Sequence, residues 1–279
     1  PGGPDGDAEG VGCMAAAIID VYRALDQWAP FDTQMDFDNA GFLVGRGERE
    51  VRRVLVSLDI TEAVAAEAGR WGAELIVSHH PVIFHPVKAL TDQTSTGRTL
   101  LLLAEQGIGA VCAHTNLDAA QGGVNDCLAR ALELDGVELL CRDGTDGQGR
   151  PYGIGRVGST TGAPMYAPAF AAFVKEALGA NGVRYVDARR PVRRVAVGGG
   201  ACADLLRDAL ALGCDTFVTA DVKYNGFLDA KALGVNLIDA GHYPTEQVVC
   251  PVLAKWLAAG FPQVEILSTS RHKEAFLYL

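Results

Sequence analysis

The residues of this chain best suited to chemistry are histidines and carboxylates, which gather in three short polar clusters. The clusters are Ser-His-His-Pro at residues 78–81, His-Thr-Asn-Leu-Asp at residues 114–118 and Gly-His-Tyr-Pro-Thr-Glu at residues 241–246. A neutral imidazole is the commonest metal ligand among protein side chains, and a carboxylate supplies a hard oxygen donor. The three clusters are therefore candidate ligand sets for a metal site.

The first cluster follows an apolar segment, residues 73–77, which we expect to be a strand. His79 and His80 come directly after it, where the backbone turns and both rings can converge on one point. Pro81 favours an extended backbone at His80. A single histidine in such a place is more often structural, whereas two in a row make a ligand role equally plausible.

The other two clusters have structural alternatives of their own. Asp118 follows an expected strand at residues 110–113. An acidic or amide side chain after a strand often only stabilises a turn, by hydrogen bonding to the backbone. His242 and Glu246 lie four residues apart, so a helix beginning here places them on one face. A carboxylate in the first turn of a helix is also stabilised electrostatically without any metal.

Taken together, the clusters favour two metal ions over one. In parallel α/β sheets, ligands gather beyond the carboxyl ends of the strands. An open catalytic zinc site has about three protein ligands, whereas two cations ~3.5 to 4 Å apart with a bridging carboxylate use five. The mixed nitrogen and oxygen donors suit zinc, iron, manganese, cobalt or nickel. The five candidate ligands are His79, His80, Asp118, His242 and Glu246.

Two further histidines are weaker candidates for a metal or substrate site. His85 lies between Phe84 and Pro86 and is expected in an exposed turn. His272 belongs to the polar segment Arg-His-Lys-Glu, where a solvated surface position is favoured over a place in a substrate pocket.

Strands and helices alternate along the chain, which predicts an α/β fold with a largely parallel sheet. We expect strands at residues 41–44, 51–58, 73–77, 110–113, 152–157, 193–197, 216–219, 236–238 and 264–267. We expect helices at residues 15–28, 61–71, 98–106, 124–132, 168–178, 204–212, 226–233 and 251–259. The expected organisation is a flexible tail at 1–14, a first α/β domain at 15–135, a second at 136–240 and a segment returning to the first at 241–279.

The composition argues against a nucleic-acid-binding protein, a membrane-spanning protein and a disulfide-rich protein. The chain has 279 residues, is 49% hydrophobic and carries a net charge of −10, which disfavours nucleic acid or an anionic membrane as the main partner. No apolar run reaches the ~18 to 20 residues that span a bilayer. The seven cysteines lack CxxC spacing, and Cys112, Cys127, Cys214 and Cys250 are expected as buried free thiols. We therefore expect a protein of the reducing cytoplasm.

Longer motifs around these clusters resemble a known family. They are DNAGFLVG, SLDIT, GAELIVSHHPVIF, AHTNLDAAQGGVND, GGGA, DTFVTADVKYN and DAGHYPTE, in that order along the chain. This set resembles the Nif-three-like family, also called GTP cyclohydrolase type 2 homologues or dinuclear metal-centre hexameric proteins. The chain departs from the family pattern at Ala220, where glycine is common, and at Asn225, where histidine is common. The interval between residues 135 and 193 is too short for the extra domain of some relatives.

The resemblance implies two α/β domains of the Nif-three-like type, with mostly parallel mixed sheets and a dinuclear site between them. By motif, the metal ligands would be the same five residues, with Glu246 as the bridge and His114 as a nearby substrate or second-sphere residue. Family members commonly form homohexamers, as trimers of dimers with the metals facing an internal cavity.

Three functions remain open at this level. The first is a metal-dependent hydrolase of the GTP cyclohydrolase type 2 kind, in which a metal-bridging water attacks a small-molecule substrate of unknown identity and His114 relays a proton. The alternative is a non-enzymatic metal-binding or regulatory oligomer. The third is Rossmann-type nucleotide binding through Gly198, Gly199 and Gly200, with Asp221 near the acidic position. A glycine turn that permits close packing explains the same three glycines more simply.

Overall fold

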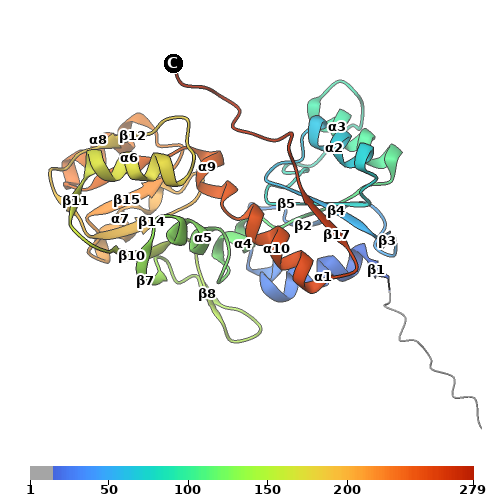
Figure 1. Cartoon of the computed structure of the whole chain (residues 1–279), viewed down its shortest axis with the longest axis horizontal. Helices are drawn as coiled ribbons and strands as arrows, with labels where there is room; N and C mark the ends of the chain where they lie inside the picture. Colours follow the sequence, from blue (N-terminus) through green and yellow to red (C-terminus); the bar gives the residue numbers. More distant parts are fainter. Residues whose placement is uncertain (1–14) are drawn as a thin grey trace, which may run out of the picture.

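The computed structural model describes residues 15–279, and the expected flexible tail at 1–14 lies outside these residues. The described chain is a mixed α/β protein built around two sheets that lie side by side (Figure 1).

The first sheet has five strands, and its parallel part leads into the first two polar clusters. Four neighbouring strands run parallel, and the strand at one edge is antiparallel. In spatial order the strands are β17 (Glu265–Ser268), β4 (Arg53–Ser57), β5 (Leu75–Ser78), β6 (Gly109–Cys112) and β2 (Gly41–Val44).

Helices cover both faces of the first sheet, which explains why its central strands β5 and β6 are buried along their whole length. Val54 and Val56 of β4 face a core shared with α1 (Ile18–Trp28) and α10 (Cys250–Gly260). Leu55, on the opposite face, packs in a second core with α2 (Glu62–Trp71) and α3 (Ser95–Gln106). Successive residues of one strand therefore enter different cores, as the two-residue period of a strand requires.

The second sheet has six strands and is parallel only at its centre. Strands β14, β15 and β16 run parallel, whereas the remaining three pairings are antiparallel. In spatial order the strands are β12 (Arg184–Val186), β16 (Asn236–Asp239), β15 (Thr216–Thr219), β14 (Arg194–Val197), β10 (Arg156–Thr160) and β7 (Leu134–Leu139). The expected mixed sheets are thus confirmed, with the parallel pairing concentrated where the polar clusters follow.

The second sheet is also covered on both faces. Val195 and Val197 pack with α5 (Val124–Ala131) and α6 (Ala167–Ala177) on one face. Ala196 packs on the other face, in a core with α7 (Leu206–Ala211) and α8 (Tyr224–Leu233).

The chain crosses between the two sheets more than once. Helices α4 (Thr115–Ala119) and α5 lead from the first sheet to the second, and α9 (His242–Gln247) and α10 lead back (Figure 1). Strand β17 then pairs with β4. The exact domain boundaries at residues 135 and 240 stay a prediction.

The remaining elements are short. They are the strand pairs β1 (Ala16–Ala17) with β3 (Glu50–Val51), β8 (Gly144–Thr145) with β9 (Pro151–Tyr152) and β11 (Met165–Tyr166) with β13 (Pro191–Val192), and the 3-10 turns η1 (Phe31–Thr33) and η2 (Ala203–Leu205).

The strand predicted at residues 51–58 is interrupted at Arg52, between β3 and β4, and the one predicted at residues 152–157 is wrong. The segment is divided between β9 and β10, with a turn between them. Gly155 has a φ of +74°, and a Cβ at Gly153 would lie 1.9 Å from the carbonyl oxygen of Cys141. Gly155 therefore serves the left-handed backbone conformation and Gly153 the close approach of Cys141, and a run of apolar residues reveals neither. The helix expected at 204–212 is likewise shortened, because its first turn is the 3-10 turn η2.

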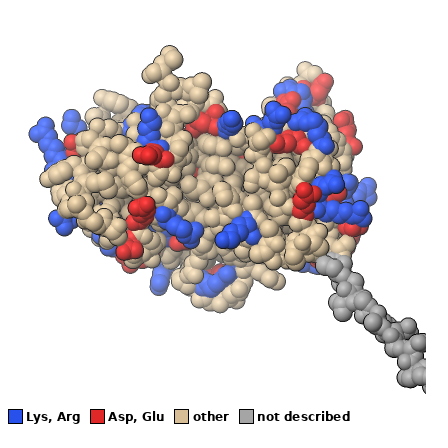
Figure 2. All heavy atoms as spheres, viewed as in Figure 1, with Lys and Arg blue, Asp and Glu red and all other residues tan. Residues whose placement is uncertain are grey.

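Lysine and arginine side chains alternate with acidic ones over the face shown in Figure 2. Within residues 15–279, no helix combines the length and the apolar character needed to cross a bilayer.

Arg156 is the buried charge that ties β10 to the connection between the sheets. It is 2% exposed. Its guanidinium donates hydrogen bonds to the carbonyl oxygens of Gly153 (2.8 Å), Gly155 (2.9 Å) and Ala120 (2.9 Å). It also forms a 2.8 Å ion pair with Asp126 on α5. The loop that follows α4 is therefore fixed by a charge on the second sheet.

We predict that Arg156→Met lowers the free energy of unfolding by about 3 to 5 kcal/mol, because it leaves buried carbonyls and Asp126 without their donor. Denaturant unfolding followed by circular dichroism measures this loss. Arg23→Met, at an exposed position on α1 with a 4.0 Å contact to Asp20, is the control and should leave the unfolding midpoint unchanged. Equal midpoints for the two variants would contradict the prediction.

Candidate metal centre

The carboxyl ends of the parallel strands of both sheets meet at one place. From the first sheet, β4 leads to Asp59, β5 to His79 and His80, and β6 to His114. From the second sheet, β14 leads to the three-glycine loop, β15 to Asp221 and β16 to His242. Ligands of parallel α/β sheets bind beyond the carboxyl ends of the strands, which we call the strand-end rule. Both sheets of this chain follow it.

Glu246 lies at the centre of this cluster, and its two carboxylate oxygens face different partners. Its Oε2 is 2.8 Å from His80 Nε2 and 3.0 Å from His242 Nε2. Its Oε1 is 3.8 Å from His79 Nε2, which in turn lies 3.5 Å from Asp118 Oδ1. These contacts define two groups of side chains that could each hold a cation. They are His80–His242–Glu246 and His79–Asp118–Glu246.

The buried polar atoms of the second group have no hydrogen-bond partner of their own. His79 Nε2 and Asp118 Oδ1 are both buried and both unpaired among the described residues. An unpaired polar atom in a protein interior costs about 1 to 3 kcal/mol, so two of them facing each other require an explanation. A cation between them satisfies both, and the residues present therefore fit a bound metal.

The other ring nitrogen of each histidine is already occupied. His79 Nδ1–H donates to the carbonyl oxygen of Ala113 at 2.8 Å. A carbonyl can only accept, so the proton of the neutral ring is on Nδ1 and the lone pair of Nε2 is free. His80 Nδ1 lies 2.8 Å from Asp59 Oδ1, and His242 Nδ1 lies 2.7 Å from Asp221 Oδ2. These contacts fix each ring with its other nitrogen, Nε2, toward Glu246, as metal-binding histidines require.

His114 has the same arrangement but lies to one side. Its Nδ1 is 2.7 Å from Asp38 Oδ1, and its ring centroid is 5.2 Å from that of His79. It forms a third possible metal-binding group with His79 and His80. His114 is therefore placed either to bind a cation or to exchange a proton beside one.

Proton affinities in the cluster reflect the pairing of imidazoles with carboxylates. Burial alone would lower the pKa of His80, but its hydrogen bonds to Asp59 and Glu246 outweigh burial and raise that pKa to about 10. Burial would raise the pKa of Asp38, yet the hydrogen bonds from His114 and Thr115 hold it at about 2. Burial raises the pKa of Asp118. Protons and cations compete for these atoms, because a ligand must be deprotonated to bind metal.

The three-glycine loop after β14 packs directly on the cluster. A Cβ at Gly200, whose φ is +64°, would lie 2.2 Å from Glu246 Oε1. The Gly200 amide donates to Thr245 Oγ1 at 3.1 Å, and the Gly199 amide donates to Asn125 Oδ1 at 2.9 Å. Asp221 is engaged by His242. The glycines therefore serve close packing, and the Rossmann-type interpretation finds no support in this geometry.

The structure corrects one expectation for a histidine. His272 is not on the solvated surface, because its side chain is only 13% exposed and its Nε2 lies 2.7 Å from Asp59 Oδ2. His85 is exposed, as expected. Five of the six histidines of the chain thus belong to one cluster.

Sequence reasoning missed the carboxylates that hold the rings. Asp59 and Asp221 each come two residues after a strand, so the strand-end rule applied to β4 and β15 would have found them. Asp38 lies in the loop between η1 and β2, where it opens the motif DNAGFLVG, but nothing in that motif indicates a contact with His114.

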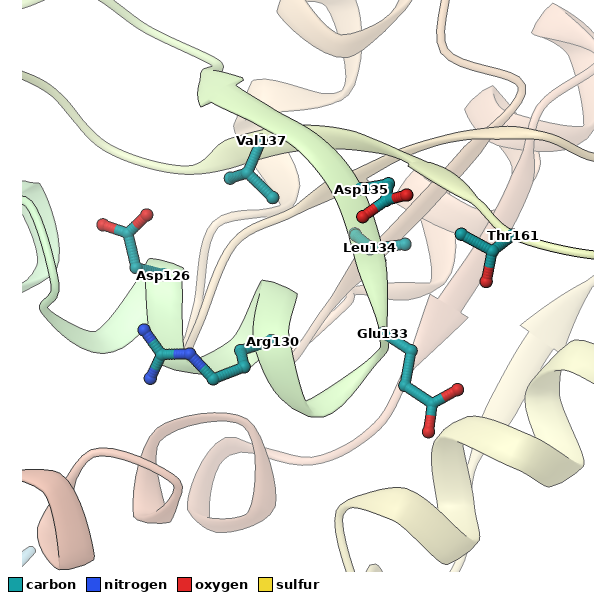
Figure 3. Close-up of a pocket in the computed structure, with 7 residues that line it drawn as sticks. All are labelled: Asp126, Arg130, Glu133, Leu134, Asp135, Val137 and Thr161. Atoms are coloured by element: carbon teal, nitrogen blue, oxygen red, sulfur yellow. The ribbon is translucent and has the colours of Figure 1, made fainter.

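One of the cavities of the described chain opens on the cluster. A cavity of about 170 Å³ is bounded by His80 and Asp59 on one side and by the hydroxyl-bearing start of α3 on the other. A larger one, of about 450 Å³, lies between α5 and β7 (Figure 3). Its lining includes none of the clustered histidines, so we do not assign the chemistry to it. Its lining residues are Asp126, Arg130, Glu133, Leu134, Asp135, Val137 and Thr161.

Comparison with known proteins agrees with the resemblance noted in the sequence. A protein of Streptomyces coelicolor named GTP cyclohydrolase 1 type 2 homolog is 37% identical, over 86% of this chain and 85% of the relative. A Clostridium perfringens protein of the same name is 34% identical, over 85% of this chain and 88% of the relative. A hypothetical protein of Staphylococcus aureus with a solved structure superposes with a TM-score of 0.90 at 30% identity, covering 95% of this chain and all of the other. Residues 16–274 match the Duf34/NIF3 (NGG1p interacting factor 3) family, and the chain therefore belongs to it.

Proposed function

We propose that this protein is a dinuclear, divalent-metal-dependent hydrolase with GTP cyclohydrolase type 2-like activity on a small-molecule substrate. The observation that carries the proposal is the placement of Glu246, with one carboxylate oxygen beside each of two histidine-containing groups. A buried carboxylate that faces two ligand groups can serve both at once, which is the arrangement of two-metal hydrolytic sites.

In this proposal each cation has its own protein ligands and shares Glu246. His79 and Asp118 hold one cation, and His80 and His242 hold the other. The mixed nitrogen and oxygen donors suit zinc, iron, manganese, cobalt or nickel. When bound, the pair would stabilise developing negative charge and acidify water near neutral pH.

The chain supplies the remaining groups that a hydrolysis needs. His114, fixed by Asp38, is the proposed proton relay, because its ring lies beside the two groups and its Nδ1 is held by a carboxylate. The cavity beside His80 and Asp59 is the proposed approach for a small substrate. The names of the relatives suggest a purine nucleotide such as GTP.

We further propose a homo-oligomer, specifically a hexamer, working in the cytoplasm. The family resemblance supports the hexamer. The six cysteines within residues 15–279 are free thiols, which supports a reducing compartment.

The metal content of variants tests whether the two groups of side chains bind separate cations. Wild-type protein is expected to hold about two cations per chain, Asp118→Asn and His242→Ala about one each, and Glu246→Ala less than one, because only Glu246 serves both groups. Elemental analysis of protein purified without a histidine tag measures this content. Glu265→Ala on β17, whose side chain is 65% exposed, is the control and should match wild type. Loss of both cations in Asp118→Asn would contradict two separate groups, as would a wild-type content below one.

The second prediction concerns the glycine loop. Gly200→Ala should weaken metal binding by about tenfold or more, because the added Cβ takes the space of Glu246 Oε1. Gly213→Ala is the matched control, since Gly213 has a similar φ of +74° and a Cβ there meets nothing within 4 Å. Both changes place alanine in a left-handed conformation and should each cost about 1 to 2 kcal/mol of stability. Equal metal affinity in the two variants, measured by chelator competition, would refute this role for Gly200.

The third prediction concerns catalysis. Metal-loaded protein should turn over a purine nucleotide or a phosphoester faster than a His80→Ala control. His114→Gln should keep its metal content but lower kcat about 100-fold, because it removes the proton relay. His85→Gln, at an exposed position outside the cluster, should match wild type. Turnover no higher than that of His80→Ala across the whole screen would exclude the hydrolase and favour a non-enzymatic metal-binding assembly.

A further inference from the structure

The last eleven residues of the chain form a segment that runs from the first sheet toward the second (Figure 1). Residues 269–279 follow β17, and we call them the C-terminal strap. Near its start, Ser270 is fixed to α2, because its hydroxyl and its amide both donate to Glu67 Oε1, at 2.6 and 3.1 Å. The strap is thus attached first to the part of the molecule that carries Asp59.

The far end of the strap is attached to the other half of the molecule. Asn181 Nδ2, in the loop before β12, donates to the carbonyl oxygen of Phe276 at 2.9 Å. A Cβ at Gly182 would lie 2.7 Å from the ring of Tyr278, so the strap packs tightly against this loop. The strap is therefore held at both ends, once beside each sheet.

His272 lies between these two attachments and contacts both sides of the metal centre. Its Nε2 is 2.7 Å from Asp59 Oδ2. Its carbonyl oxygen accepts a hydrogen bond from the hydroxyl of Tyr243 at 3.2 Å, and the two rings meet edge to face with centroids 5.1 Å apart. Tyr243 is the neighbour of His242 on α9.

Asp59 joins His272 to a proposed metal ligand. Its Oδ1 accepts from His80 Nδ1 at 2.8 Å, while its Oδ2 faces His272. The Asp59 side chain is 39% exposed, so packing alone does not fix its orientation. An imidazole lies beside each oxygen, with a hydrogen bond from His80 and a close contact to His272, so the two rings restrict how the carboxylate can turn. This is how partners beyond the ligands orient a metal site.

We propose that His272 is a positioning residue for the metal centre, which holds Asp59 so that Asp59 holds His80 toward the cation shared with His242. This inference rests on the proposed function, because it takes His80 to be a metal ligand. It also gives the C-terminal strap a role, since the strap brings His272 to a site built from strands far away in the sequence.

The test measures the affinity of the full-length protein for Co²⁺ by chelator competition, with elemental analysis of the metal retained. His272→Ala is expected to weaken one of the two Co²⁺ ions about 10- to 100-fold and to leave the other unchanged. His272→Gln should recover most of the affinity, because the polar amide of glutamine can take the place of the imidazole beside Asp59. Lys273→Ala changes the exposed neighbour in the strap and should bind like wild type.

A double-mutant cycle decides whether His272 acts through Asp59. Asp59→Asn combined with His272→Ala should bind Co²⁺ no more weakly than Asp59→Asn alone, since the second change then removes nothing further. Additive losses, equal weakening of both ions or unchanged binding in His272→Ala would each overturn the inference while leaving the proposed function intact. Absence of Co²⁺ binding by the wild-type protein would overturn both.

Discussion

The buried carboxylate of Glu246 is the group on which the rest of the site depends. It faces two sets of candidate ligands at once, yet a carboxylate in a protein interior is unfavourable unless its oxygens are satisfied. The structure meets this requirement from both sheets, with imidazole nitrogens on one side and the glycine loop closed against the other. Gly200 is glycine because any side chain there would displace the carboxylate.

The position of the cluster could be predicted from the sequence because it follows from strand geometry. His79 and His80 directly follow an apolar segment, and the same holds for His114 and His242, so the strand-end rule brought them together without any knowledge of pairing. The spacing of His242 and Glu246 similarly predicted one face of a helix, which α9 confirms. The α/β class and most strands could be predicted for the same reason, since apolar runs separated by helical periods specify a sheet covered on both faces.

What the sequence could not supply depends on contacts between distant segments. Asp38 reaches His114 across 76 positions, and its loop has no periodicity that marks it. His272 lies in a polar segment that is typical of an exposed surface, and only its position between the two halves of the molecule makes it part of the cluster. The break at Gly153 and Gly155 was also missed, because the close approach of Cys141 that demands glycine there is a tertiary contact.

The balance of charge explains why cations suit this site better than further protein contacts. Five carboxylates, from Asp38, Asp59, Asp118, Asp221 and Glu246, surround the imidazoles of His79, His80, His114 and His242. With neutral rings the cluster is strongly negative, and protons on the rings of His80 and His242 can offset that charge only by occupying the nitrogens that face Glu246. Divalent cations remove the same charge while using those nitrogens as ligands. A metal bound by this cluster would therefore also stabilise the folded chain, because the negative cluster exists only when both sheets are in place.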